Sequence, residues 1–556
     1  MSEIPQQSAN PDANASLEWL RRRWKLPGEA VPAVLALLHA ESAGSTSRNL
    51  ASPIADWGEA AAPPSAGKET PMVLVEAENG MHLQSLLLFH AETRIARRVM
   101  TMARRKPLQI PELSAQVARL FPDAEEDNPQ VAAVRLAATR AIAMITGGPG
   151  TGKTHTLARL LALLLSNGID ADKLHLTAPT GKAAERMKEA VQEAVTNLPQ
   201  ELHPWTASLQ KVANQVSTLH AWLQYHPRTR RCRRVGIPAG TVLVVDECSM
   251  VDVHVWNSLF TVLPEDARMV LVGDPHQLES VGQGATFAAL VRGAANLPEL
   301  RAAHVHLTET RRFRDRPDIL ALARALENSD PVAVETILQR CREGVGKGGV
   351  NWIPAIGPVL ALRNYPESVL QACRRVATAD TPERALQELQ KICILTAFRD
   401  ERMGALRVSQ DLDRHLQEGG GSRNQPILIT RNDPETGLRN GSIGILHREP
   451  SGSAKAYFST GDGKPLHAYP IARLPDFQIA WAITIHRSQG SEFNQVMILP
   501  PRGESPLATR ELLYTAITRA REEIHVAGDL ASIKAATIAV SPRQSLLGHY
   551  LRQDLR

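Results

Sequence analysis

The segment GGPGTGKT, Gly147–Thr154, has the residue types and the spacing of a loop that binds a chain of phosphates. It fits the pattern G-x4-G-K-T, with an apolar stretch before it and the helical stretch HTLARLLALLL after it. Glycines allow backbone N–H groups to surround phosphate oxygens, and the start of a helix adds a favourable dipole. Lys153 would contact the β- and γ-phosphates, and the Thr154 hydroxyl would bind Mg²⁺. The predicted nucleotide-binding residues of this loop are Gly147, Gly148, Pro149, Gly150, Thr151, Gly152, Lys153 and Thr154.

Two acidic residues end a second apolar stretch, within VLVVDECSM at Val242–Met250. A parallel sheet places the groups that face a ligand at the carboxyl ends of its strands. Asp246 would hold Mg²⁺, mainly through water, and Glu247 would polarise the water that attacks the γ-phosphate. Such acids also cap strand ends in many proteins, but downstream of a phosphate loop they indicate ATP hydrolysis.

A third apolar stretch leads into polar residues at Met269–Gly284, MVLVGDPHQLESVGQG. Asp274 and Gln277 would lie beside the γ-phosphate, where the Gln277 amide could report its presence through hydrogen bonds. In isolation the same residues would be interpreted as a polar turn after a strand.

These motifs need a parallel α/β sheet to hold them, and the chain contains the strands for two. Continuous apolar strands that alternate with helical segments are typical of such sheets. The first set is Ala141–Thr146, Leu174–Ala178, Val242–Asp246 and Met269–Gly273, and the second is Ile392–Phe398, Val496–Pro500 and Ile524–Ala527. A stretch rich in Gly, Asn and Pro, Gly419–Pro475, predicts a small all-β insertion in the second lobe. Helical stretches early in the chain are predicted at Leu17–Trp24, Ala33–His39 and Leu83–Met102.

The predicted domain order follows from these elements. We expect a mainly helical N-terminal domain (1–105), a linker (106–127), a first lobe (128–310, with a small insertion at about 195–238) and a second lobe (311–556, with the β insertion at about 419–476). At roughly 150 residues per domain, 556 residues are enough for such an arrangement.

The composition is that of a globular protein that does not enter membranes. Hydrophobic residues make up 43% and charged residues 22% of the chain, which excludes wholesale disorder and fibrous repeats. The longest apolar runs, such as Leu160–Leu165, fall short of the ~18 residues that a bilayer crossing needs. The first residues lack a secretion signal, and five cysteines without a CxxC pair fit free thiols. We therefore expect a cytoplasmic location.

The order of the motifs resembles that of superfamily 1 helicases. The additional segments are LTAPTGKAAERM (Leu176–Met187), STLHAWL (Ser217–Leu223), LTETRRF (Leu307–Phe313), WAITIHRSQGSEF (Trp481–Phe493) and ELLYTAITRAR (Glu511–Arg521). The last two together resemble the subgroup that moves 5′ to 3′. With the block Ile429–Leu446 and the length, the whole chain resembles the family of RecD, the alpha subunit of exodeoxyribonuclease V (RecBCD).

This resemblance implies a fold and an activity. The fold would be two tandem RecA-like P-loop lobes, with an SH3-like β insertion in the second. The activity would be ATP-dependent, Mg²⁺-requiring 5′–3′ unwinding or translocation on single-stranded and duplex DNA. The role would be double-strand-break repair by homologous recombination.

The resemblance also implies roles for residues that the loop and its acids do not cover. Arg312 and Arg519 would act as arginine fingers toward the γ-phosphate. Gln130 would read the adenine edge, although an exposed helix glutamine explains it equally well. The remaining nucleotide contacts would be Gln489, Gly490 and Glu492, and the single-strand DNA contacts Thr180, Thr218, His220, Thr484 and His486. Arg487 stands where the family usually has Lys, and its role stays open.

Partners follow from the resemblance as well. Residues 1 to about 105 would dock onto a RecC-like subunit beside a RecB-like motor-nuclease, in a heterotrimer. The chain shows no nuclease constellation of its own, so nuclease activity would belong to a partner. Three alternatives stay open: a free-standing superfamily 1 helicase, a scaffold subunit without motor activity, and a P-loop kinase or GTPase.

An arginine cluster and a few aromatic residues allow two interpretations each. The segment Tyr225–Val235 places five arginines in seven positions, either as a solvated hairpin tip or as a contact to DNA phosphates. Trp222, Phe313 and Trp481 are candidates for base stacking and equally for the core.

Overall fold

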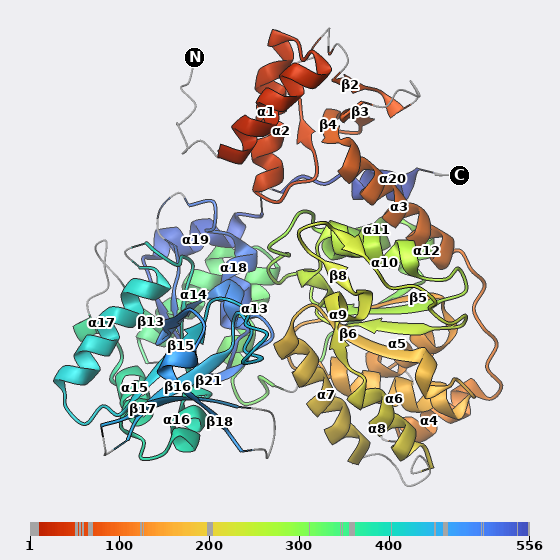
Figure 1. Cartoon of the computed structure of the whole chain (residues 1–556). Coiled ribbons are helices and arrows are strands. Elements are labelled where there is room, and N and C mark those ends of the chain that lie inside the picture. The colour runs from red at the N-terminus through yellow and green to blue at the C-terminus, as the bar shows by residue number, and fades with distance from the viewer. Residues whose placement is uncertain are drawn as a thin grey trace. The chain divides into compact units, whose positions relative to one another are not determined.

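A computed structural model describes most of the chain and divides it into two compact units (Figure 1). Unit 1 consists of residues 1–275, 279–309 and 542–556, and unit 2 of residues 276–278 and 310–541. The described residues are 11–553 without 51–53, 55–56, 58–59, 65–69, 123–124, 126, 197–203, 311, 345, 347, 355–361, 402, 450–451, 460–464, 502, 504 and 542.

The N-terminal part of unit 1 contains a sheet as well as the predicted helices. Its helical elements are α1 (Pro11–Trp24), η1 (Gly28–Ala30), α2 (Val31–Ser42) and α3 (Leu86–Ala103). A four-stranded sheet in the order β1-β4-β3-β2 lies between α2 and α3, with β1 at Arg48–Asn49, β2 at Ala61–Ala62, β3 at Met72–Ala77 and β4 at Gly80–Ser85.

Helices make up more of this part than strands do, as predicted, but the sheet was not predicted. Leu83–Ser85 belong to strand β4 and not to the predicted helix, because β4 pairs with β3 in antiparallel register. The extended backbone at Ser85 ends the strand, and α3 begins at the next residue.

The expected linker is also folded. Helix α4 (Leu113–Leu120) buries Val117 and Leu120, and α5 (Pro129–Thr139) follows it. Arg159 of α6, a helix at Lys153–Ser166, donates a hydrogen bond to the Leu120 carbonyl, so α4 is attached to α6. Of the acidic run at 123–127, residues 123, 124 and 126 lie outside the described part of the chain.

The main sheet of unit 1 is parallel, in the order β12-β5-β11-β10-β6-β7. Its strands are β5 (Ile142–Gly147), β6 (Leu174–Ala178), β7 (Ser217–Thr218), β10 (Val242–Val245), β11 (Arg268–Gly273) and β12 (His304–Leu307). The four strands predicted for the first lobe are confirmed within one or two residues at each end. The short edge strands β7 and β12 were not predicted.

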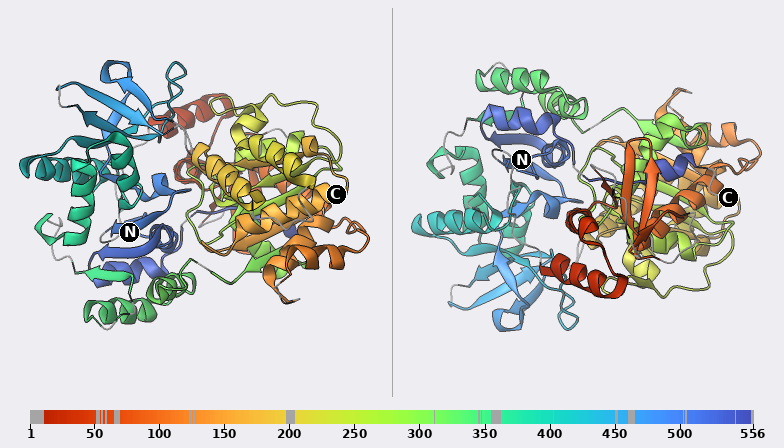
Figure 2. Two further views of the ribbon diagram at one scale, coloured as in Figure 1. Left: turned by 90° about the horizontal axis from the view of Figure 1, so that it is seen from below. Right: turned by 90° about the horizontal axis from the view of Figure 1, so that it is seen from above.

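Alternate residues of these strands face two separate cores. Ile142 and Met144 of β5 pack with helices α3, α10 (Val253–Val262) and α11 (Thr286–Asn296), whereas Ala143 and Ile145 pack with α5, α6 and α7. Helix α6 spans Lys153–Ser166, α7 spans Gly181–Thr196 and α8 spans Thr206–Asn214. Both faces of the sheet are covered (Figure 2), which explains why its strands read as uninterrupted apolar runs.

The predicted insertion at about 195–238 is only partly separate from the main sheet, and its residues 197–203 lie outside the described chain. Strand β7 joins the sheet beside β6, and α9 (Leu219–Leu223) follows it. A two-stranded hairpin, β8 (Tyr225–His226) with β9 (Arg231–Cys232), then carries the arginine cluster.

Unit 2 contains a second parallel sheet, in the order β13-β22-β21-β14-β20. Its strands are β13 (Val350–Ile353), β14 (Ile392–Thr396), β20 (Ala482–Thr484), β21 (Phe493–Leu499) and β22 (Ala520–Ala527). Helices α13 (Pro317–Glu327), α14 (Pro331–Arg342), α18 (Arg510–Ile517) and α19 (Leu530–Ile538) pack on one face, and α15 (Glu367–Thr378), α16 (Pro382–Leu389) and α17 (Ala405–Glu418) on the other. The three predicted strands of the second lobe are all present.

The predicted all-β insertion of unit 2 forms a five-stranded antiparallel sheet, in the order β18-β17-β16-β15-β19. Its strands are β15 (Asn424–Ile429), β16 (Ile443–Arg448), β17 (Ala454–Phe458), β18 (His467–Pro470) and β19 (Phe477–Ile479). The last strand extends a few residues beyond the predicted end at 476.

The end of the chain belongs to unit 1, which corrects the prediction that the second lobe runs to residue 556. Helix α20 (Leu547–Arg552) packs on α3 and α11, as Figure 1 shows for α3. Leu547, Tyr550 and Leu551 are buried there. The burial of these three apolar side chains explains why the end of the chain belongs to unit 1.

No helix in the described part of the chain has both the length and the hydropathy that a bilayer crossing requires.

Candidate functional site

The phosphate loop joins the carboxyl end of β5 to the first turn of α6. Lys153 and Thr154 are the first two residues of α6, so the helix N-terminus opens onto the loop. Lys153 Nζ donates hydrogen bonds to the carbonyl oxygens of Gly147 at 2.6 Å and Gly148 at 2.8 Å. The Thr151 hydroxyl donates to the same Gly148 carbonyl at 2.8 Å. The loop thus folds back onto its own lysine at the N-terminus of α6, where the helix dipole favours an anion.

Gln130 lies directly against this loop. Asn128 caps α5 by accepting a hydrogen bond from the Gln130 backbone at 2.8 Å, and this fixes the start of the helix. The side-chain amide of Gln130 donates to the Thr151 carbonyl at 3.1 Å. Gly152 has φ +81°, and a Cβ there would lie 2.4 Å from Gln130 Nε2. The left-handed backbone at 152 favours glycine, and a Cβ there would also displace the Gln130 amide.

Asp246 and Glu247 follow β10, in the same unit as the phosphate loop. Asp246 accepts a hydrogen bond from the Glu247 backbone at 2.8 Å, and its own N–H donates to the Thr177 carbonyl at 2.9 Å. Burial and the negative charge of Glu247 raise the pKa of Asp246 to about 6, against the opposing charges of Lys153 and Arg186. The charges of the loop lysine and the acidic pair are therefore coupled.

Glu247 has an unusual backbone conformation for its residue type. Its φ is +50°, in the left-handed region, where residues with a Cβ are uncommon. Behind it, the Cys248 thiol is buried and donates to the Val245 carbonyl at 3.1 Å. Such strain is often retained where it aims a side chain into a site.

The predicted DNA contacts of unit 1 lie at two helix N-termini. The Thr180 hydroxyl accepts from the Ala183 backbone at 3.2 Å at the start of α7, and the Thr218 hydroxyl accepts from the Ala221 backbone at 3.1 Å at the start of α9. His220 contacts the Tyr225 ring, with centroids 5.3 Å apart, and its burial lowers its pKa. Both threonines thus act as helix caps, beside whose open N–H groups a phosphate would be favoured.

The arginine hairpin is anchored at its base and exposed at its tip. The Arg234 guanidinium lies 4.3 Å from the Trp222 ring centroid and donates to the Trp222 carbonyl at 2.9 Å. Four of the five arginines are exposed, namely Arg228, Arg230, Arg231 and Arg233. The cluster therefore lies on an exposed hairpin, which is compatible with both interpretations that the sequence allowed.

Gln277 belongs with unit 2, together with the residue after it. The Leu278 N–H donates to the Thr515 hydroxyl at 2.8 Å, and the Leu278 carbonyl accepts from Gln489 Nε2 at 3.1 Å. Thr515 and Gln489 are both buried. Gln489, which was predicted as a nucleotide contact, thus binds the backbone next to Gln277.

Arg312 and Glu492 form an ion pair, and both side chains are largely buried. Arg312 Nη1 also donates to the Thr518 carbonyl at 3.4 Å. Glu492 accepts in addition from Arg521 at 3.1 Å. Arg312 is thus positioned by a carboxylate, whereas Glu492 is occupied by two guanidinium groups.

Arg519 lies in the turn between α18 and β22 and is only 3% exposed. It donates to the carbonyls of Thr515 at 3.1 Å and Ser491 at 3.3 Å, and lies 3.5 Å from the Thr518 hydroxyl. Among the described residues, no carboxylate lies within ion-pair distance of it. The oxygens that accept hydrogen bonds from this buried guanidinium are all neutral.

The remaining unit 2 residues lie around η8 (Ile485–Ser488). Thr484 precedes this turn, His486 lies within it, and Gly490 follows with φ +73°. Burial and the charge of Arg399 lower the pKa of Arg487.

The three aromatic candidates for base stacking are core residues. Trp222 is 5%, Phe313 2% and Trp481 4% exposed, and Trp481 donates to Asp413 at 2.9 Å. Their faces are covered by protein, so the core interpretation holds for each.

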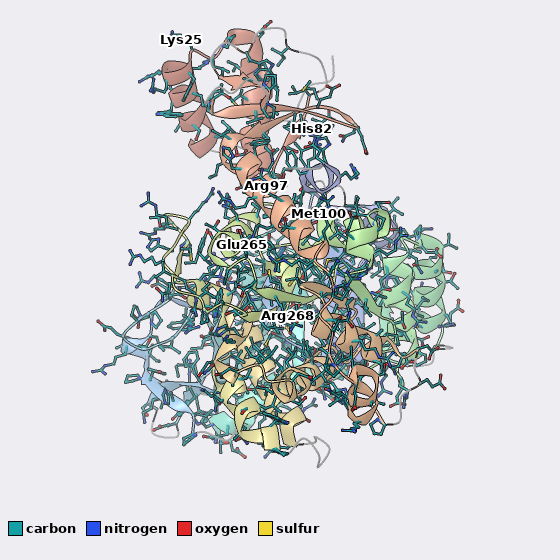
Figure 3. All side chains as sticks on the ribbon, turned by 90° about the vertical axis from the view of Figure 1, so that its right-hand side faces the viewer. Lys25, His82, Arg97, Met100, Glu265 and Arg268 are labelled. Carbon is teal, nitrogen blue, oxygen red and sulfur yellow. The ribbon has the colours of Figure 1, made fainter. Side chains whose placement is uncertain are left out.

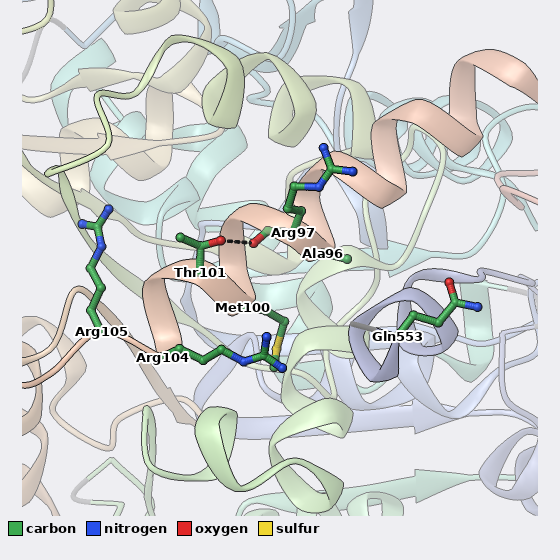
Figure 4. Close-up of a pocket in the computed structure, with 7 residues that line it drawn as sticks. All are labelled: Ala96, Arg97, Met100, Thr101, Arg104, Arg105 and Gln553. Atoms are coloured by element: carbon green, nitrogen blue, oxygen red, sulfur yellow. Dashed lines mark hydrogen bonds between the residues drawn. The ribbon is translucent and has the colours of Figure 1, made fainter. Parts of the chain in front are cut away.

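A cavity of about 290 Å³ lies beside α3, and none of the predicted site residues lines it. Arg97 and Met100 lie on successive turns of α3 (Figure 3), and Figure 4 shows the cavity between this helix and the end of the chain. It is lined by Ala96, Arg97, Met100, Thr101, Arg104, Arg105 and Gln553. Arg104 pairs with Glu299 at 3.3 Å, and Arg105 donates to the Glu265 carbonyl.

Sequence reasoning missed several residues that position the site. Asn128 caps the helix that presents Gln130, Arg186 acts electrostatically on Asp246, and Thr515 holds the backbone after Gln277. Arg186 and Thr515 lie inside segments that were singled out, but nothing in their spacing marks them as contacts.

Comparison with known proteins agrees with this geometry. Residues 126–343 match the family model of an AAA domain, and residues 479–527 match a UvrD-like helicase C-terminal domain. The chain is 35% identical over 456 residues to the RecBCD enzyme subunit RecD of Mycolicibacterium smegmatis, covering 79% of this chain and 76% of that protein.

More distant relatives have related names. The RecBCD enzyme subunit RecD of Haemophilus influenzae is 29% identical, over 80% of this chain and 75% of that protein. The ATP-dependent RecD2 DNA helicase of Deinococcus radiodurans is 27% identical, over 71% and 48%. A solved structure of Bacteroides Pif1 bound to ssDNA matches with 16% identity and a TM-score of 0.38, over 73% of this chain and 92% of that one.

Proposed function

The chain belongs to the RecD family of RecBCD enzyme subunits, and on that premise we propose that it is an ATP-dependent DNA helicase acting as the RecD-type subunit of a helicase–nuclease. Its task would be to move 5′ to 3′ on single-stranded DNA and to open duplex DNA during double-strand-break repair by homologous recombination. Membership of this family speaks against the kinase or GTPase alternative.

One observation supports ATP hydrolysis most directly. The phosphate loop ends at Lys153, where α6 begins, and the charge of this lysine acts on Asp246 after β10. A phosphate-binding loop and an acidic strand end in one unit are the minimum that P-loop hydrolysis needs. Glu247, held in a left-handed conformation, would orient the attacking water.

The donor set of this unit fits Mg²⁺. Thr154 offers a hydroxyl and Asp246 a carboxylate, both of which are hard oxygen ligands of the kind that Mg²⁺ prefers. When bound, the ion would neutralise negative charge on the phosphates. The raised pKa of Asp246 fits the same role, since a nearby cation would favour its ionised form.

Arg519 and Arg312 would stabilise the charge that develops during phosphoryl transfer. Arg519 meets only neutral acceptors, so its charge is available, whereas Arg312 is held by Glu492. ATP binding and phosphate release would then alternate the grip on DNA of Thr180, Thr218 and His220 with that of Thr484 and His486. Each cycle would move the protein along one strand.

Unwinding of tailed duplexes tests the proposal. The full-length chain, alone and with RecB-like and RecC-like subunits, is mixed with ATP and duplexes that carry either a 5′ or a 3′ single-stranded tail. We expect ATP-dependent unwinding of the 5′-tailed substrate and little of the 3′-tailed one. Equal rates without ATP, or DNA-independent ATP turnover, would count against a motor function.

A free-standing helicase is the second candidate. It is favoured by similarity to the RecD2 DNA helicase of Deinococcus radiodurans, although the match spans under half of that protein. Gel filtration separates the two. Co-elution with RecB-like and RecC-like chains supports the subunit role, in which residues 1–105 would dock onto the RecC-like chain.

A further inference from the structure

Three distant parts of unit 1 meet at the segment that follows Gln277. This segment, Glu279–Gly284, will be called the post-sensor segment because Gln277 is the predicted γ-phosphate sensor. It contacts the end of α2 and the residues that follow it, 41–49, and the C-terminal tail, residues 543–547. Neither contact was expected, since more than two hundred positions separate the partners.

Arg543 holds the post-sensor segment from the tail. Its Nη1 donates to the carbonyl oxygens of Ser280 and of Gly282, the latter at 3.1 Å, and its Nε lies 3.8 Å from the Glu279 carboxylate. The side chain is only 17% exposed. A largely buried guanidinium that binds two backbone carbonyls fixes the path of that backbone, because the Ser280 carbonyl would otherwise lose this donor. The Gly282 carbonyl would keep the Ser280 hydroxyl, at 3.2 Å.

Gly44 holds the same arginine from the N-terminal side. A Cβ on Gly44 would lie 2.5 Å from Arg543 Cζ, and the φ of +96° also favours glycine. The Gly44 carbonyl accepts a hydrogen bond from the Gly284 N–H at 2.8 Å. The guanidinium therefore lies close against residue 44, while residue 44 binds the far end of the post-sensor segment.

The opposite side of the post-sensor segment rests on the start of α10. The Val253 N–H donates to the Gln283 carbonyl at 2.9 Å, and the side chains of His254 and Gln283 are 2.7 Å apart. Gln283 also donates to the Glu41 carbonyl at 3.2 Å. The segment is thus clamped from both sides, which suits an element that must transmit a displacement rather than absorb it.

The tail is itself fastened to the N-terminal part. The Gln544 carbonyl accepts from the Thr46 N–H at 2.8 Å, and Gln544 Oε1 accepts from the Asn49 N–H at 2.8 Å. Ser545 and Leu546 donate to the buried Glu92 of α3. A change in the N-terminal part is therefore passed to Arg543 through its immediate neighbours.

The chain path gives this arrangement its significance. The polypeptide enters unit 1 from unit 2 between Leu278 and Glu279, and again between Ser541 and Pro542. Arg543 binds the backbone just after the first crossing and lies itself just after the second. One side chain therefore ties the two crossings together, next to Gln277.

We propose that Arg543 is a positioning residue that sets the place of Gln277 for ATP hydrolysis, and that Gly44 couples the N-terminal part to it. The proposal rests on the proposed function, because it assumes that Gln277 senses the γ-phosphate. Arg543 touches no reacting group, so its loss should leave ATP binding intact and reduce turnover. An event on the N-terminal part, such as the docking of a partner subunit, would reach the ATP site by this route.

Kinetics of the full-length protein test it. Arg543→Ala should lower DNA-stimulated kcat roughly tenfold, within the usual range for coupling between sites, while KM for ATP stays within about twofold. Gly44→Ala should have a similar effect, because its Cβ displaces the guanidinium. The double variant should be no worse than the stronger single variant, since both changes break one connection.

The chain offers matched controls. Arg552→Ala removes an arginine of α20 that pairs with Glu78, at 3.1 Å, and Gly28→Ala adds a Cβ that meets nothing within 4 Å. Both should keep wild-type turnover. If Arg543→Ala does not fold, as judged by circular dichroism, Arg543→Lys replaces it, with a smaller loss of kcat expected.

The outcomes separate this inference from the proposed function. Unchanged kcat in folded Arg543→Ala, or losses that multiply in the double variant, would overturn the positioning role. If Lys153→Ala keeps DNA-stimulated hydrolysis, the proposed function itself fails. If Arg543→Ala has wild-type turnover and Lys153→Ala is inactive, the inference about Arg543 is rejected while the proposed function stands.

Discussion

The ammonium group of Lys153 donates a hydrogen bond to the Gly147 carbonyl at 2.6 Å, so the two ends of the phosphate loop are joined by its own lysine. Phosphate oxygens compete for the same donors, and a charged acceptor forms the stronger bond. The lysine is therefore already in place when a nucleotide binds.

Lys153→Ala should abolish unwinding and lower ATP turnover by roughly 10²–10³-fold, as the loss of one electrostatic contact to the transition state typically does. Phosphate release in the presence of single-stranded DNA measures this. Lys211→Ala, which removes an exposed lysine that pairs with Asp172 at 2.8 Å, serves as control. Unimpaired unwinding by Lys153→Ala would dismiss the catalytic assignment.

Arg519→Ala should lower kcat by about 10³-fold or more, as removal of an arginine finger does, and change the Kd for ATP by less than about threefold. The reason is that its charge meets only neutral acceptors within its own unit. Turnover and fluorescent-nucleotide titration are compared for the same preparation. Arg374→Ala, on the exposed face of α15, should behave as wild type, and near wild-type turnover of Arg519→Ala would contradict the assignment.

Asp246→Asn should inactivate the ATPase and stabilise the fold at pH 8. The pKa of Asp246 is raised from 3.8 to about 6, so the folded protein binds this proton more tightly than the unfolded chain does. Stability is then lost as pH rises from about 4 through 6, by roughly 1–3 kcal/mol, and the neutral amide avoids that loss. Urea unfolding at pH 4, 6 and 8 measures it.

A gain that grows from pH 4 to pH 8 is expected for Asp246→Asn. Asp172→Asn is the control, because its pKa is lowered by the hydrogen bond from Lys211 and no stabilisation should follow. A free energy of unfolding that does not change at any pH would refute the electrostatic account of Asp246.

Glu92→Gln should be nearly neutral, whereas Glu92→Ala should cost about 2–4 kcal/mol, because it leaves buried donors unsatisfied. Glu92 accepts from the hydroxyls of Thr46 and Ser545, which can reverse direction, and from the fixed N–H groups of Gln84 and Leu546. One amide can satisfy both sets. Burial also raises the pKa of Glu92, so a neutral replacement fits.

Thermal and urea unfolding measure the Glu92 variants. Glu78→Ala, at an exposed carboxylate, is the control. Equal destabilisation by Gln and Ala would mean that the negative charge, not the hydrogen bonds, is what the site needs.

Much of the fold could be predicted because its signals are local. The strands that carry the phosphate loop and Asp246 are continuous apolar runs bounded by turns, and both lie where predicted. The β insertion was recognisable from its Gly, Asn and Pro turns. The N-terminal sheet was missed because two of its strands have only two residues each, too few to show alternation.

The candidate site was predictable residue by residue, but not contact by contact. Motif spacing predicted roles for Lys153 and Asp246, and the family resemblance predicted one for Arg519. Neither gave any indication that Gln489 would bind the Leu278 carbonyl, or that Trp222 would be covered by Arg234. These contacts depend on which helices pack together, and side-chain type alone does not specify that.

The sequence by itself determined the chemistry of this protein. The phosphate loop and the acidic strand end are each defined by a short run of consecutive residues, together with the strand or helix beside it. Only the tertiary structure decided that the last helix returns to unit 1, that Thr46 meets Gln544 across 498 positions, and that Arg543 ties the chain crossings beside Gln277. Such pairings arise when buried apolar faces find one another. No local periodicity records which distant face will be the partner.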